Sequence, residues 1–365
     1  MRKLKHLAES AGLPAPPFHT TPGEGHRHRA RLAVRGRARS PKIGLFQAGS
    51  HRIVDTPNCL VHHPRINATA KLLRQAIRQT GIQPYADAPH RGQLRYVQIV
   101  VDRATERVQV VLVGNGEDPG VLGDLPEVFA ALLGDSLQGL FFNAQPERSN
   151  AVLGPKMVKL YGEDALCEHI AGRDVFFPPG AFGQNHLPLF EQAVRRIAEL
   201  VPERSRVAEF YCGVGSIGLP LIDRVERIAF NERSPDGLDG LKLGLAALPP
   251  EMRARATVFA GAAGEQPQAM ADADLVLVDP PRKGLDGPLR EALIRTPPKR
   301  LVYLACGLDR MIEDVAALTE QHGLQLRGIE AFDFFPFTEH VETLVWLDRN
   351  GEALGPGARS ASHLA

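Results

Sequence analysis

The sequence predicts an α/β protein with a mostly parallel sheet in its C-terminal half and a smaller α+β domain before it. The first observation is a short strand-like segment, Val207–Phe210, followed by glycines 213, 215 and 218. The second is the alternation of strand-like and helix-like segments from there to Leu347. Such alternation is typical of a parallel sheet with helices on both faces. The third is the mixture of short strands and helices before residue 176, which is typical of a largely antiparallel α+β domain.

The 365 residues are enough for two domains. We expect an α+β domain over 1–175, a second domain over 176–348 and a disordered tail over 349–365. The boundary rests on Pro178 and Pro179, which interrupt regular structure, and on Gly180 and Gly183 after them.

Apolar spacing gives the expected elements. The first domain should contain strands at 42–47, 51–55, 94–101, 107–113 and 139–143, helices at 65–79 and 125–133, and a hairpin of 159–164 with 173–177. The second should contain strands at 207–210, 225–230, 256–259, 275–278, 301–305, 324–331 and 342–347. Its helices should lie at 187–200, 238–248, 289–294 and 311–321, with a further helix opening at Leu219.

Composition is that of an ordinary globular protein, with 44% hydrophobic residues, 23% charged residues and a net charge of +1. No apolar run is long enough to span a bilayer, and the N-terminus lacks the apolar region of a signal peptide. The four cysteines are scattered without a CxxC pair, which argues against disulfides or a metal site. We therefore expect a cytoplasmic protein without a membrane partner.

A basic segment marks the N-terminal half, where no acidic residue occurs from Gly25 to Val54. Arginines at odd positions, among them Arg27, Arg29, Arg31 and Arg35, would share one face of a strand. Such a row suits the phosphate backbone of a nucleic acid. The alternative is the solvated face of an edge strand.

Polar residues follow several strands of the second domain, where parallel sheets bind ligands. Gly213 and Gly215 let the backbone approach a ligand. Glu232 ends the second strand and can accept both hydroxyls of a ribose, while Pro280 and Pro281 aim Asp279 into the cleft. This pattern fits either a dinucleotide or S-adenosylmethionine.

Cys306 and Glu342 are the candidate catalytic residues. Cys306 ends a strand and is followed by Gly307 and Arg310, so a thiol with a lowered pKa could act as a nucleophile. Glu342 begins the last strand and, partly buried, could serve as a general base. His340 could relay a proton or only pack.

Together these motifs resemble the RNA uracil-5-methyltransferase family, over residues 27–348. The resemblance is carried by HRARLAVRG, the segment at Ser50–Asp55, FGQNH, YCGVGSIGL, DPPRKGLD, YLAC and FDFFPFTEHVE. It implies a Rossmann-like class I methyltransferase domain after an RNA-binding domain, with S-adenosylmethionine as cofactor and 5-methyluridine in RNA as product. By position, Cys306 resembles the family's nucleophile and Glu342 its proton acceptor. The positions that match its cofactor site are Gln184, Tyr211, Glu232 and Asp279.

The chain departs from the family at three places. Ala305, Gly307 and Leu308 surround the cysteine where relatives usually have Ser, Asn and Pro. Ala262 replaces an acidic or amide residue after the third strand. Cys59 matches only the last of four cysteines that hold an iron–sulfur cluster in many relatives, so we expect no cluster.

We expect a monomer that acts on ribosomal RNA rather than tRNA. Two alternatives stay open. One is an RNA-binding or RNA-folding protein of the same fold with weak or no catalysis, and the other is an NAD-dependent dehydrogenase built on the same glycine loop.

Overall fold

The structure, a computed structural model, describes residues 1–50, 52–320 and 323–350. The predicted tail lies outside these residues from position 351 on. The chain divides into an N-terminal unit, residues 22–168 with 177–187, and a C-terminal unit, residues 1–21, 169–176 and 188 onward.

The first 21 residues do not join the α+β domain, contrary to the expected domain boundaries. Helix α1 (Arg2–Ser10) buries Leu4 and Ala8 in the core of the C-terminal unit. Strand β1 (Phe18–His19) pairs in parallel with β16 of the same unit. Two residues of strand are too few for a sequence pattern to reveal, because their conformation depends on the partner strand.

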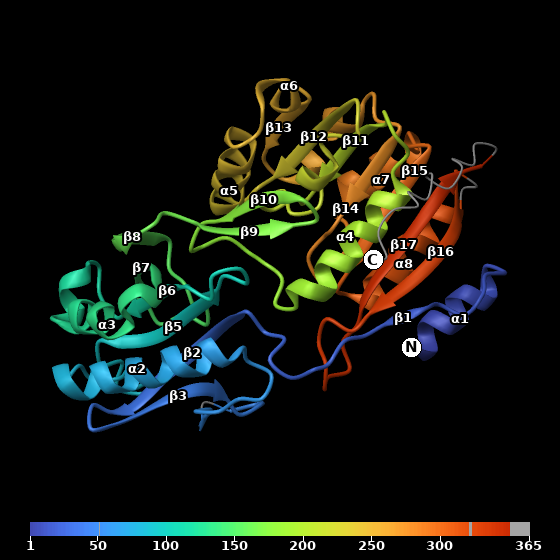
Figure 1. The fold of residues 1–365 in the computed structure, drawn as a ribbon. Coiled ribbons are helices and arrows are strands. Elements are labelled where there is room, and N and C mark those ends of the chain that lie inside the picture. The colour runs from blue at the N-terminus through green and yellow to red at the C-terminus, as the bar shows by residue number, and fades with distance from the viewer. Residues whose placement is uncertain (51, 321–322, 351–365) are drawn as a thin grey trace, which may run out of the picture. The chain divides into compact units, whose positions relative to one another are not determined.

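The N-terminal unit is built on a seven-stranded sheet in the order β4-β3-β2-β5-β6-β7-β8. All neighbouring pairs are antiparallel except β6 and β7. The strands are β2 (Arg29–Arg37), β3 (Ser40–Phe46), β4 (Ile53–Asp55), β5 (Leu94–Val101), β6 (Val108–Gly114), β7 (Leu137–Ala144) and β8 (Lys156–Gly162). Helices α2 (Pro64–Thr80) and α3 (Leu125–Leu133) bury Leu73 and Phe129 in one apolar core with the sheet (Figure 1). The predicted α+β architecture is confirmed.

The predicted hairpin of 159–164 with 173–177 is wrong. Strand β8 belongs to the large sheet, and the hairpin is formed by β9 (Leu166–Ile170) and β10 (Arg173–Phe177). Between them Ala171 and Gly172 both have positive φ, 46° and 90°. Two such residues make the type I′ turn whose twist matches that of antiparallel strands.

The C-terminal unit is built on an eight-stranded sheet in the order β1-β16-β17-β15-β14-β11-β12-β13. Its strands besides β1 are β11 (Arg206–Phe210), β12 (Arg227–Glu232), β13 (Ala256–Ala260), β14 (Leu275–Val278), β15 (Arg300–Ala305), β16 (Leu324–Phe332) and β17 (Glu342–Arg349). Only β17 is antiparallel to its neighbours, so the predicted mostly parallel sheet is confirmed.

Helices cover both faces of this sheet. They are α4 (Leu187–Leu200), α5 (Pro235–Ala246), α6 (Pro250–Arg253), α7 (Gly287–Arg295) and α8 (Leu308–Glu320). α1, α7 and α8 share an apolar core with the strands. α4 crosses the opposite face (Figure 1), where Arg196 stacks on Trp346 of β17 at 5.3 Å.

The helix predicted to open at Leu219 is a single 3₁₀ turn, Leu219–Leu221. β12 begins at Arg227, which leaves little chain for a longer helix. Among the described residues, every helix is too short or too polar to cross a membrane.

A buried ion pair fixes the register of β17 against β15. Arg300 and Asp348 lie opposite each other, and the guanidinium donates from Nε at 2.7 Å and from Nη2 at 3.0 Å. Both side chains are buried, so removing one partner leaves an uncompensated charge.

We therefore expect Asp348→Ala to lower the free energy of unfolding by about 3 kcal/mol, measured by urea denaturation. Asp239→Ala, which breaks an exposed pair with Lys242, is the control and should cost well under about 1 kcal/mol. Equal losses in the two variants would contradict the role of burial.

Candidate active site

Four of the predicted site residues lie at the carboxyl ends of adjacent parallel strands. Glu232 is the last residue of β12, and Tyr211, Asp279 and Cys306 directly follow β11, β14 and β15. These strands are neighbours in the order β12-β11-β14-β15 and all are parallel. The edge that they share is therefore the ligand-binding edge expected for such a sheet.

Glu342 lies at the same edge of the sheet, although its strand runs in the opposite direction. It is the first residue of β17, which is antiparallel to β15, and Thr343 is paired with Ala305. Cys306 and Glu342 are the next positions along the two strands. Since paired Cα atoms of antiparallel strands lie roughly 5 Å apart, the two side chains start from neighbouring backbone positions.

The Cys306 thiol is half-buried, and its pKa is raised to about 11 by burial and by the charges of Glu342 and Asp279. Arg282 lowers this pKa but is outweighed. The predicted lowering of the thiol pKa is therefore wrong for this state. Burial is the largest cause, and the two acids that add to it lie at the ends of other strands, far from Cys306 in the sequence.

Glu342 is fully buried rather than partly buried as predicted. Neither carboxylate oxygen has a hydrogen-bond partner among the described residues. Burial, and next Asp279, hold the pKa of Glu342 well above its usual value. Burial also raises the pKa of Asp279 to about 7. His340 is exposed, and its ring meets Phe335 edge-on at 6.1 Å.

The glycine loop has the geometry required for close approach of a ligand. Gly213 and Gly215 have φ of 57° and 81°, and a Cβ at Gly213 would point into open space. Glu232 supports this loop, because its Oε2 accepts from the N–H of Gly213 at 2.7 Å. Open space over glycine beside acceptor oxygens fits the ribose and the cationic end of S-adenosylmethionine.

Tyr211 links the glycine loop to α7. Its backbone has φ of 59°, which is unusual for a side chain other than glycine. Its hydroxyl donates to Asp286 at 3.0 Å, and Asp286 also caps α7 by accepting from Leu289 N–H. The sequence analysis did not identify Asp286, although Asp-Gly-Pro before an apolar segment is a signal for the start of a helix.

Glu209 is a second residue that the motif analysis passed over. It lies within β11, is 1% exposed, and would collide with any side chain at Gly218. Burial, and next Asp279, hold its pKa well above the usual value. The sequence signal that could have identified Glu209 is an acidic residue in the middle of a strand whose other buried residues are apolar.

Gln184 belongs to the N-terminal unit, where it lines a small cavity with Arg29 and Glu168. Its contribution to the cofactor site stays a prediction.

The row of arginines is not uniformly exposed. Arg31 is exposed, whereas Arg29 is buried and donates to the carbonyl of Ala181 at 2.9 Å. Arg35 is also buried and makes a bidentate pair with Asp87. The rings of Phe46, Tyr85 and Tyr96 surround its guanidinium, each at 5.1 Å. The prediction of a fully cationic face is therefore wrong for Arg29 and Arg35, because other segments of the chain cover them.

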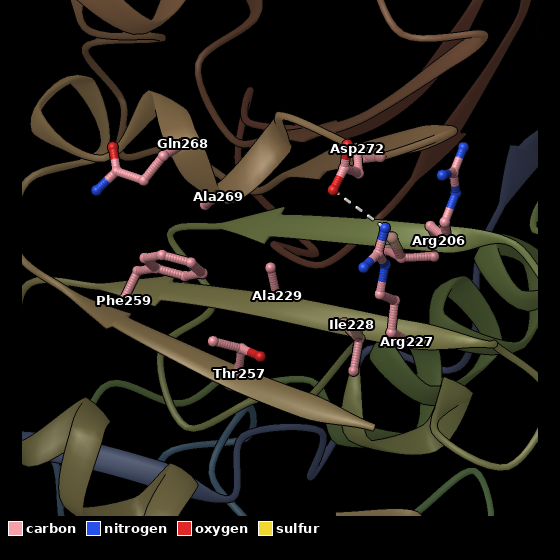
Figure 2. A pocket seen from close by; sticks show the side chains of 11 residues that line it. Arg206, Arg227, Ile228, Ala229, Thr257, Phe259, Gln268, Ala269 and Asp272 are labelled. Carbon is pink, nitrogen blue, oxygen red and sulfur yellow. Dashed lines mark hydrogen bonds and ion pairs between the residues drawn. The ribbon is translucent and has the colours of Figure 1, made fainter. Parts of the chain in front are cut away.

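A separate pocket of about 150 Å³ lies between the first residues of β11 and β12, strand β13 and the segment 268–273 (Figure 2). It is below the usual range for a cofactor site, which begins at roughly 300 Å³. Its arginines are already paired, Arg206 with Asp274 and Arg227 with Asp272. We therefore do not assign it to the site at the carboxyl edge.

The mostly parallel sheet, the glycine loop and the acidic residue at the end of β12 define a Rossmann-like domain of the class that binds a dinucleotide or S-adenosylmethionine. A family profile described as tRNA (uracil-5-)-methyltransferase matches residues 269–350. An RNA methyltransferase of Protochlamydia amoebophila is 34% identical, over 92% of this chain and 88% of that protein. One of Parasynechococcus marenigrum is 30% identical, over 92% of this chain and 72% of that protein.

The structure is also similar to that of Pyrococcus abyssi tRNA (uracil-54, C5)-methyltransferase in complex with S-adenosyl-L-homocysteine. The TM-score is 0.78 at 25% identity, over 94% of this chain and 81% of that one. The chain belongs to the RNA uracil-5-methyltransferase family. It is an S-adenosylmethionine-dependent RNA methyltransferase.

The electrostatics predict how Cys306 reacts with iodoacetamide. Only the thiolate reacts, so the alkylation rate should keep rising up to a pH of about 11. Glu342→Gln removes a negative charge and should shift this profile to lower pH, whereas Arg282→Met should shift it to higher pH. The measurement is alkylation of the Cys306 peptide by mass spectrometry, with Cys306→Ser as the blank. A wild-type midpoint near pH 8.5 would contradict the assigned environment.

Proposed function

We propose that the protein methylates C5 of a uridine in structured RNA through a covalent intermediate on Cys306. The observation that carries this proposal is the register of β15 and β17, which sets Cys306 beside Glu342 at the ligand-binding edge. A nucleophile and a base on neighbouring strands suit a substrate that must be attacked at one ring carbon and deprotonated at the next.

The proposed reaction uses each residue once. The Cys306 thiolate adds to C6 of the uracil, and the electron pair of the C5–C6 double bond moves toward the C4 carbonyl. When bound, S-adenosylmethionine would supply an electrophilic methyl group to C5, and its positively charged sulfur would keep the electron pair of the broken S–C bond and leave as a neutral thioether. Glu342 then removes the C5 proton, the C5–C6 double bond forms again, and the Cys306 sulfur leaves C6.

The high pKa values suit these roles. A carboxylate whose pKa is raised by burial is a stronger base once it is ionised, and Glu342 is such a group. The thiol is protonated at rest and must lose its proton before addition. Asp279, with a pKa of about 7, is the proposed acceptor of that proton.

We propose ribosomal RNA as the substrate, with tRNA as the alternative. We also propose a cytoplasmic monomer without an iron–sulfur cluster, since Cys59 alone matches the cysteines of such clusters. The test is nucleoside mass spectrometry of ribosomal RNA and of tRNA from a strain that lacks the gene. The RNA that loses 5-methyluridine in this strain is the substrate.

A second candidate function is RNA binding or folding with weak or no catalysis. The observation that favours it is the raised pKa of Cys306, together with apolar Ala305 and Leu308 beside the thiol.

Covalent trapping on modified RNA distinguishes uridine methylation from RNA binding without catalysis. With RNA containing 5-fluorouridine, C5 carries no proton to remove, so wild-type protein should remain covalently attached to RNA on a denaturing gel. Cys306→Ala should form no adduct. Glu342→Gln should form the adduct with ordinary RNA as well, because release should slow by ~10²- to 10⁴-fold. Absence of any adduct with the wild-type protein would favour the RNA-binding function.

RNA contact in the N-terminal unit is proposed for Arg27 and Arg31, the exposed or half-exposed arginines of the predicted set. We expect Arg31→Ala to weaken RNA binding and to reduce the slope of log affinity against log salt by about 1, measured by fluorescence anisotropy. Lys242→Ala in the other unit is the control, and an equal change in its slope would contradict the assignment.

A further inference from the structure

The loop over residues 333–341 joins β16 to β17 at the edge of the sheet that carries Cys306. Phe332 and Glu342 are the last paired residues, so the loop starts and ends beside the proposed general base. The stem is firmly packed. Phe334 is 2% exposed and meets the rings of Phe332 and Phe190 edge-on, at 6.0 and 6.2 Å.

The tip of this loop is also held in one conformation. The backbone N–H and the hydroxyl of Thr338 both donate to the carbonyl of Phe335, at 3.1 and 2.8 Å. The His340 N–H donates to the Thr338 hydroxyl at 3.2 Å, and the His340 ring packs against Phe335. These contacts hold the backbone on both sides of Phe337 and thereby fix the direction in which its side chain projects from the loop.

Phe337 combines two unfavourable features. Its side chain is 79% exposed, the highest fraction among the exposed large hydrophobic residues of the described chain. Its backbone has φ of +66°, a conformation that a bulky side chain adopts only under strain. Strained backbone conformations cluster at active sites and ligand clamps, and here the strained residue also carries an exposed aromatic ring on a loop that ends at Glu342.

We propose that Phe337 is a stacking platform for an RNA base next to the target uridine. This inference rests on the proposed function. A uridine that enters the site must leave its stack, which exposes the face of its neighbour. An aromatic ring can cover that face whatever the identity of the base. The position of Phe337, five residues before Glu342 in a closed loop, suits contact with a base adjacent to the one that reacts.

A fluorescent variant tests the contact directly. The chain has one tryptophan, Trp346, so Phe337→Trp in a Trp346→Phe background leaves a single reporter at the tip. We expect its emission to be quenched by total RNA from a deletion strain, but not by polyphosphate, which has similar charge and no bases. Equal responses to both, or no response to RNA, would overturn the proposal. Because fluorescence quenching requires no methyl transfer, this experiment tests the contact with RNA bases even if the protein does not methylate C5.

Substitutions then separate stacking from a structural role. Phe337→Gly removes the ring and relieves the strained φ, so its Tm should be no lower than that of the wild type. Its KM for RNA should rise by ~10- to 100-fold, with the affinity for S-adenosylmethionine unchanged. Phe337→Tyr should stay near the wild-type value, whereas Phe337→Leu should resemble Phe337→Gly.

The exposed Leu243 of α5 offers a matched control, and Leu243→Ala should leave the KM for RNA unchanged. An unchanged KM in Phe337→Gly, or a wild-type KM in Phe337→Leu, would overturn the proposal. So would a self-association of the wild type, seen by sedimentation, that Phe337→Gly abolishes.

Discussion

The antiparallel insertion of β17 between β15 and β16 is the constraint on which the site depends. In a wholly parallel sheet, every residue at the ligand-binding edge would follow a strand. Only a reversed strand brings its first residue to that edge, and in β17 this residue is Glu342. The ion pair of Arg300 with Asp348 lies at the far end of the same strand pair and opposes slippage. A slip by one residue would turn Glu342 to the other face of the sheet.

The charges at this edge are strongly biased toward acids. Glu209, Asp279 and Glu342 all have raised pKa values, with burial as the largest cause. Asp279 contributes to the shifts of the other two, so the three groups resist being ionised together. Arg282 is the cation that lowers the pKa of Cys306 and Glu342. A site of this kind gains stability when a cation binds, which agrees with a cofactor that carries a sulfonium and an ammonium group.

Much of the C-terminal sheet could be predicted because its buried strands are short apolar runs between glycines and prolines. Most of the candidate site residues could be proposed for the same reason, since Tyr211, Glu232, Asp279 and Cys306 stand where such a run ends, whereas Glu342 stands where one begins. Their electrostatics could not be predicted. The pKa of Cys306 depends on Glu342 and Asp279, which lie 36 and 27 positions away in the sequence, on either side of it. Likewise, alternation identified β2, but the rings that cover Arg35 come from three other segments.

The unusual residues around Cys306 have a physical explanation at one position. A Cβ at Gly307 would lie 2.6 Å from the carbonyl oxygen of Arg282 and 3.2 Å from its Cα. These are backbone atoms, so a side chain at 307 would push the turn after Asp279 away from Cys306. An asparagine at this position would therefore require a different separation of the two loops. Glycine allows the backbone of Arg282 to pack directly against the residue after the thiol. Among the described residues, Arg282 is the cation that opposes the raised pKa of Cys306, and glycine at 307 lets its backbone come this close to the residue after the thiol.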